Sequence, residues 1–176
     1  MSRISEQDFD GCLYTMRVLR EQERIMYGNE PMQIINCTHT EDEKAKYDMD
    51  WTGVTESNIA VLCMDENKDR RYGWTNGERD YSKPQYLATY NSQMFNFDKY
   101  EPMMEKYNET GIKQYYTAGY LDGVILFDLT ELPKDKIYGE WKMKAEIKEK
   151  TMSESSSKRM QDRFCIPNNY GYIYRK

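Results

Sequence analysis

Two groups of charged side chains near the middle of the chain have the types and spacing that phosphodiester chemistry uses. Asp48 and Asp50 stand two residues apart, and Glu66 and Lys68 follow them at E-x-K spacing. Clustered carboxylates hold Mg2+ ions, and a nearby cation offsets the negative charge that develops on a phosphate under attack. These four residues are therefore candidates for a metal-dependent phosphodiesterase site.

The elements around these residues must bring the two groups together. Residues two apart on a strand point to the same face, so Asp48 and Asp50 would share a face, as would Glu66 and Lys68 if their strand continues. The segment 58–65 is the most apolar in the chain, and its unbroken run predicts a central strand covered on both faces. Two adjacent strands could then place the acidic groups side by side.

The remaining pattern predicts a mixed α/β (α+β) domain with a central mixed sheet flanked by helices. We expect a single domain over 1–176, with its core at about 5–130 and a helix, a loop and a strand in 131–176. In chain order, the expected elements are a helix over 5–28, strands over 32–38 and 58–65, a long loop or irregular hairpin over 66–84, a strand over 85–95, a helix over 97–111, a hairpin over 112–132, a helix over 134–150, a linker-like loop over 151–161 and a last strand over 170–175.

Composition and charge narrow the class of protein. The net charge is −5, and the 25 Lys and Arg residues are scattered along the sequence, which argues against broad nonspecific nucleic-acid binding but leaves a local basic cleft open. The four cysteines have no C-x-x-C spacing, which indicates free thiols in a reducing compartment. No apolar run reaches the ~18 residues of a membrane span. We therefore expect a cytoplasmic protein without a membrane partner.

The order of these elements and residues resembles the PD-(D/E)xK nuclease superfamily, also called restriction-endonuclease-like. The resemblance covers roughly residues 5–130, from the first helix through the acidic stretch 41–48 and the apolar strand to the acidic-x-Lys step. In that family, an Asp at the start of one strand and the E-x-K of the next bind the metal and activate water. The resemblance implies that Asp48 or Asp50 is the first metal ligand, Glu66 the second and Lys68 the catalytic cation, with Mg2+ as the cofactor.

One departure from the family pattern keeps two function classes open. The family's E-x-K lies within the hydrophobic strand, whereas Glu66 and Lys68 follow the apolar run. Alignment on the strand interior instead places Leu62 and Met64 at the E and K positions, which would make the site inactive. The sequence thus predicts either a small Mg2+-dependent nuclease acting on nucleic-acid phosphodiesters, or a catalytically inactive binding or inhibitor protein of phage or mobile-element type that engages a host protein or an assembly.

Overall fold

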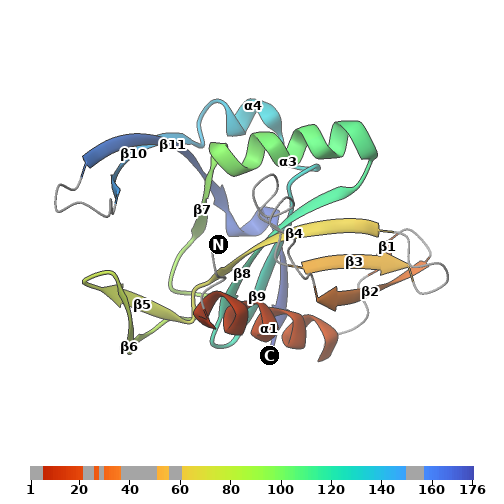
Figure 1. Ribbon diagram of the computed structural model, residues 1–176, viewed down its shortest axis with the longest axis horizontal. Coiled ribbons are helices and arrows are strands. Elements are labelled where there is room, and N and C mark those ends of the chain that lie inside the picture. Colours follow the sequence, from red (N-terminus) through yellow and green to blue (C-terminus); the bar gives the residue numbers. More distant parts are fainter. Residues whose placement is uncertain (1–5, 22–25, 28–29, 37–50, 56–60, 150–156) are drawn as a thin grey trace.

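In the computed structural model, a seven-stranded mixed sheet lies between α1 on one face and α3 with α4 on the other (Figure 1). The structure describes residues 6–21, 26–27, 30–36, 51–55, 61–149 and 157–176. This arrangement confirms the predicted mixed α/β fold with a central sheet flanked by helices.

The large sheet places the apolar strand at its centre. In spatial order its strands are β1 (Met26–Tyr27), β2 (Glu30–Asn36), β3 (Trp51–Thr55), β4 (Val61–Asp69), β8 (Lys113–Tyr120), β9 (Gly123–Asp128) and β12 (Tyr172–Arg175). All neighbours are antiparallel except β4 and β8, which are parallel. A parallel pair needs a crossover connection, and here the crossover contains α3.

The crossover and the C-terminal part of the chain add two smaller sheets. They contain a hairpin of β5 (Tyr72–Thr75) and β6 (Glu78–Pro84), and a three-stranded sheet in the order β10 (Lys142–Glu149), β11 (Ser157–Pro167) and β7 (Ser92–Asn96). The helices are α1 (Glu6–Glu21), α3 (Phe97–Thr110) and α4 (Lys134–Ile137), with a 3-10 turn η1 at Asn168–Tyr170. Both β5–β6 and β10–β11 project on the same side of the molecule, at the left in Figure 1.

The central sheet separates two cores because its side chains alternate between faces. On β9, Val124 and Leu126 pack with α1, whereas Ile125 and Phe127 pack on the α3 side. The α1 core contains Cys12, Tyr14, Met16, Val18, Leu19, Tyr115, Val124 and Leu126.

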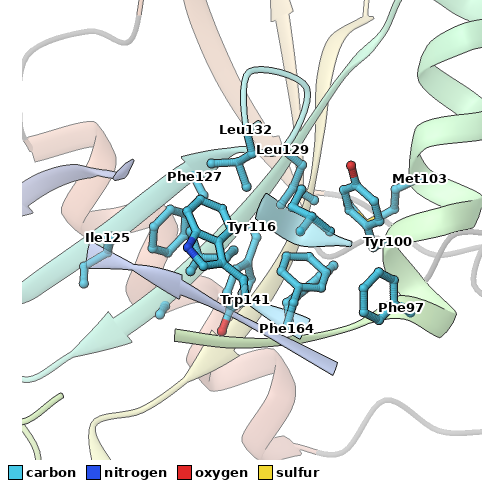
Figure 2. Packing of buried hydrophobic residues seen from close by; sticks show 14 of the residues in the cluster. Phe97, Tyr100, Met103, Tyr116, Ile125, Phe127, Leu129, Leu132, Trp141 and Phe164 are labelled. Atoms are coloured by element: carbon cyan, nitrogen blue, oxygen red, sulfur yellow. The ribbon is translucent and has the colours of Figure 1, made fainter. Parts of the chain in front are cut away.

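Aromatic rings fill the core on the α3 side (Figure 2). Tyr116 stacks on Phe127 at 5.7 Å between ring centroids, and Phe164 packs edge to face on Tyr100 at 5.1 Å. Phe164 also contacts Phe97 at the start of α3, with the ring centroids 5.0 Å apart. These contacts fix α3 and β11 against the sheet.

Several predicted elements are confirmed by the structure. The helix predicted over 97–111 is α3, and it ends where Gly111 adopts a left-handed conformation with φ of 72°. The hairpin predicted over 112–132 is β8–β9, and the last predicted strand is β12. The segment 66–84 includes a hairpin that turns at Asn76 and Gly77, both with positive φ.

Five predicted boundaries or elements are wrong. The strand predicted over 58–65 continues to Asp69, so the loop or hairpin predicted from residue 66 begins after it. The first helix ends at Glu21 rather than Gly28, because Met26–Tyr27 forms β1. The strand predicted over 85–95 is confined to Ser92–Asn96. The helix predicted over 134–150 is limited to Lys134–Ile137, because charged and apolar residues alternate through Lys142–Glu149 and this period of two suits a strand. The predicted loop over 151–161 overlaps β11, which begins at Ser157.

Candidate functional site

The E-x-K residues lie inside the central strand. The strand β4 runs past the apolar segment to Asp69, and its parallel pairing with β8 sets Glu66 opposite Tyr116 and Lys68 opposite Ala118. The condition that the strand continue through Glu66 and Lys68 is therefore met, and both side chains lie on the same face of the sheet.

That face is the one covered by α3. Glu66 is only 2% exposed, and its Oε1 forms ion pairs with Lys99 of α3 and with Lys68, the latter at 3.1 Å. The lysine side chains are partly exposed, at 25% for Lys99 and 36% for Lys68. A buried carboxylate therefore pairs with two partly exposed lysines.

A cleft of about 280 Å3 lies over this pair of lysines. Four cationic side chains reach it from separate parts of the chain, and we call it the basic cleft. Its lining is Lys68, Arg70, Met94, Phe95, Asn96, Lys99 and Arg163. Among the described residues, no carboxylate lines the cleft, so positive charge gathers there although the chain as a whole is acidic.

Hydrogen bonds to a buried tyrosine and a partly buried glutamine position the two arginines. The Arg70 guanidinium hydrogen bonds to the hydroxyl of Tyr116, and that hydroxyl donates to the Met94 carbonyl at 3.3 Å. Burial raises the pKa of Tyr116 to about 12, and the Arg70 charge opposes this rise. The Arg163 guanidinium donates twice to Gln161 Oε1, at 2.9 and 2.8 Å. Both guanidinium groups are thus anchored beside the cleft.

The opposite face of β4, toward α1, also carries polar side chains, but these are hydrogen-bonded within the core and do not line the basic cleft. Asp65 Oδ2 accepts from the Thr117 hydroxyl at 2.5 Å, and Asn67 Oδ1 accepts from the Thr15 hydroxyl of α1 at 2.7 Å. Thr15, Asp65 and Thr117 are all fully buried. This group links α1 to β4 and β8 and leaves no access for a ligand, so we assign it a structural role.

The C-terminal end of β4 is held by a charge network on the α1 side. Asp69 accepts from Arg71 at 2.9 Å and from Arg79 of β6 at 2.5 Å, and Arg71 also contacts Asp10 of α1. A Cβ on Gly11 would lie 2.7 Å from the Cβ of Asp69, so only glycine allows α1 to approach this closely. The network joins α1, β4 and the β5–β6 hairpin.

The structure brings together two of the four predicted site residues. Glu66 and Lys68 are in contact, whereas Asp48 and Asp50 lie outside the described residues. Among the described residues, no three His, Cys, Asp or Glu side chains cluster in a way that could hold a metal ion. Mg2+ takes an octahedral set of oxygen ligands, so Glu66 with its two lysines does not fit a Mg2+ site by itself.

Three residues of the basic cleft were not found by the sequence analysis. Arg70 continues the alternation of Glu66 and Lys68 on the same strand face, so a longer predicted strand would have revealed it. Lys99 and Arg163 come from α3 and β11, far away in the sequence, and no local pattern marks them. Only the packing of α3 and β11 brings them to β4.

Comparisons with known protein families, with curated proteins and with solved structures found no match for this chain. The site is therefore interpreted from its own geometry. No helix in the described part of the chain is long and apolar enough to cross a membrane.

Proposed function

We propose that the basic cleft binds the phosphodiester backbone of a nucleic acid, in a cytoplasmic protein of restriction-endonuclease-like architecture. The observation that carries this proposal is the convergence of Lys68, Arg70, Lys99 and Arg163 on one cleft in a chain of net charge −5. Phosphate groups are the common anions of nucleic acids, and Lys and Arg contacts to them supply most of the sequence-independent affinity.

The overall acidity of the chain confines the attraction for nucleic acid to the basic cleft. A basic protein attracts nucleic acid over much of its surface, whereas here attraction is confined to the place where positive side chains gather. Anionic ligands would be repelled elsewhere and directed to the basic cleft. A narrow footprint of this kind suits one or two phosphates held in a defined position.

The proposal has an enzymatic form and a binding form. In the enzymatic form, the protein is a Mg2+-dependent nuclease that needs Asp48 or Asp50 as metal ligands beside Glu66. In the binding form, the same cleft holds phosphates without cleaving them, and Glu66 serves to position Lys68 and Lys99. The ion pairs of Glu66 favour the binding form because they already occupy one carboxylate oxygen.

Fluorescence anisotropy with a labelled oligonucleotide tests whether the basic cleft binds nucleic acid. We expect the Lys68→Ala/Arg163→Ala double variant to bind about tenfold or more weakly than wild type and to show a shallower dependence on salt. Arg17→Ala is the matched control, because Arg17 is exposed on α1, on the opposite face of the sheet. Equal affinities of the double variant and wild type would refute the proposal.

The variant Glu66→Gln separates the two forms. The amide oxygen of the variant can still accept from Lys68 and Lys99, while loss of the buried negative charge makes the cleft more positive. We therefore expect oligonucleotide binding without metal to become roughly threefold to tenfold tighter. If the protein is a nuclease, the same change abolishes Mg2+-dependent or Mn2+-dependent cleavage, which a gel assay detects. Asp50→Ala should then lose cleavage as well. Absence of cleavage by the wild type at millimolar metal would leave the binding form.

A protein-binding function is the second candidate, and strand β12 favours it. This strand is an edge strand of the large sheet, and its side chains Tyr172 and Ile173 are 55% and 47% exposed. Exposed edge strands with apolar side chains can pair with a strand of another protein. An inhibitor or assembly subunit that engages a host protein would use such an edge. An Ile173→Lys variant should lose that partner while retaining oligonucleotide binding, as tested by affinity capture.

A further inference from the structure

A second pocket opens beside the basic cleft, and its walls are largely aromatic. It has a volume of about 290 Å3, and we call it the aromatic pocket. Tyr72, Trp74, Tyr90 and Tyr120 line it together with the amide side chains of Gln85 and Gln93. Trp74 is 52% exposed and Tyr90 is 49% exposed. Large aromatic surface is therefore presented to solvent at one defined place.

The aromatic pocket and the basic cleft adjoin each other. Arg70 and Met94 line both of them, so a ligand can occupy the two without leaving the surface. The cationic end of this continuous surface suits a phosphate, and the aromatic end suits a flat ring. A phosphate and a flat ring occur together in each nucleotide of a nucleic-acid strand.

Hydrogen bonds hold the walls of the aromatic pocket in place. The backbone N–H of Gln85 donates to the Arg71 carbonyl at 2.9 Å, and its side-chain amide donates to the Tyr90 hydroxyl at 3.1 Å. The Tyr120 hydroxyl donates to Gln93 Oε1 at 2.7 Å. A pocket with fixed walls loses little conformational entropy when a ligand binds.

The β5–β6 hairpin presents Trp74 from a stable turn. Asn76 and Gly77 have φ of 54° and 79°, the left-handed pair that a tight two-residue hairpin turn requires. At the base of the hairpin, the rings of Tyr72 and Tyr81 pack edge to face at 4.9 Å. The exposed indole is therefore carried by an ordered element.

We propose that the aromatic pocket receives an unstacked base of single-stranded nucleic acid whose backbone phosphates lie in the basic cleft. This inference rests on the proposed function of the cleft, and it adds that the nucleic acid bound there is single-stranded. Bases in a duplex stay stacked within the helix, and side chains stack on them only when they are unpaired or displaced. Aromatic stacking with a positively charged groove is the common mode of single-strand binding.

Charge complementarity favours this occupant over a peptide. An apolar peptide would use the aromatic rings but gain nothing from the four adjacent cations. An acidic peptide would use the cations but would lack flat rings at regular spacing. A single nucleic-acid strand satisfies both ends of the surface at once, because each phosphate is joined through a sugar to a base.

The test compares a fluorescein-labelled thymidine oligonucleotide with the same strand in a duplex and with an abasic strand of equal length. We expect Trp74→Ala to weaken binding of the thymidine strand by about tenfold and to leave the duplex and the abasic strand unchanged. Trp74→Phe should restore part of the affinity. Tyr138→Ala is the control, because Tyr138 directly follows α4 and, at 50% exposed, is a similarly exposed aromatic residue.

The outcomes separate this inference from the proposed function. If Trp74→Ala binds the thymidine strand like wild type while Lys68→Ala/Arg163→Ala binds it weakly, the aromatic pocket is not a base site and the cleft still binds phosphate. If the wild type binds neither strand nor duplex, both proposals are overturned. Because Trp74 is half exposed, its replacement should not disturb the core, and a thermal melt by circular dichroism checks this.

Discussion

The two faces of strand β4 use polar residues in opposite ways. Toward α1, Asp65 and Asn67 are paired with threonines and covered by the helix. Toward α3, Glu66 pairs with lysines that are partly exposed. Both faces bury carboxylates on the same strand, and the basic cleft lies on the α3 face. The identity of the covering side chain, a short hydroxyl or a long cation, therefore determines whether a buried acid belongs to the core or to a surface site.

The largest expected effect concerns the aromatic core beneath the basic cleft. Phe164 is fully buried and contacts Phe95, Phe97 and Tyr100. We expect Phe164→Ala to lower the free energy of unfolding by about 3–5 kcal/mol, because it removes a ring and leaves a cavity. Urea denaturation measures this loss. A loss below about 1 kcal/mol would show that this core does not fix α3 and β11.

A smaller effect is expected on the α1 face. Thr117→Val keeps the side-chain shape but removes the hydroxyl that donates to buried Asp65. We expect the free energy of unfolding to fall by about 1–3 kcal/mol, because a buried carboxylate loses a donor, while oligonucleotide affinity stays unchanged. Arg163→Ala should give the reverse result, because Arg163 donates to the neutral amide of Gln161 and its removal strips no buried carboxylate of a donor. We expect a change in stability of less than about 1 kcal/mol and weaker oligonucleotide binding. If both variants affected stability and binding alike, the distinction between the two faces would fail.

The last effect appears only at high pH and again involves the α3 side. Burial raises the pKa of Tyr116 and of Tyr100 from 10.0 to about 12. Between these values the unfolded chain loses a phenolic proton that the folded chain retains, so stability is complete below pH 10 and falls as the pH rises toward 12. Urea unfolding at several pH values measures this slope. Tyr116→Phe should make this slope shallower.

Local patterns in the sequence predict an element correctly where a single signal, such as an apolar run or a terminal glycine, dominates the segment. The apolar run before Asp65 identified the central strand, and the helix ending at Gly111 followed from its periodicity and its glycine. The segment 134–150 carries charged residues at i,i+4 spacing, which favours a helix, but Lys142–Glu149 follows the alternation of charged and apolar residues and forms a strand. Pairing with β11 stabilises that alternation as a strand, and this partner is not visible within the segment itself.

The sequence by itself determined that Glu66 and Lys68 could share a strand face, because side chains alternate along any extended chain. It also determined that the protein would be acidic and rich in tyrosine. Only the tertiary structure decided that Lys99 and Arg163 meet Lys68 and Arg70 around one cleft. Their meeting depends on the crossover through α3 and on the pairing of β11 with β7. Contacts between residues distant in sequence arise from packing, and local patterns carry no record of them.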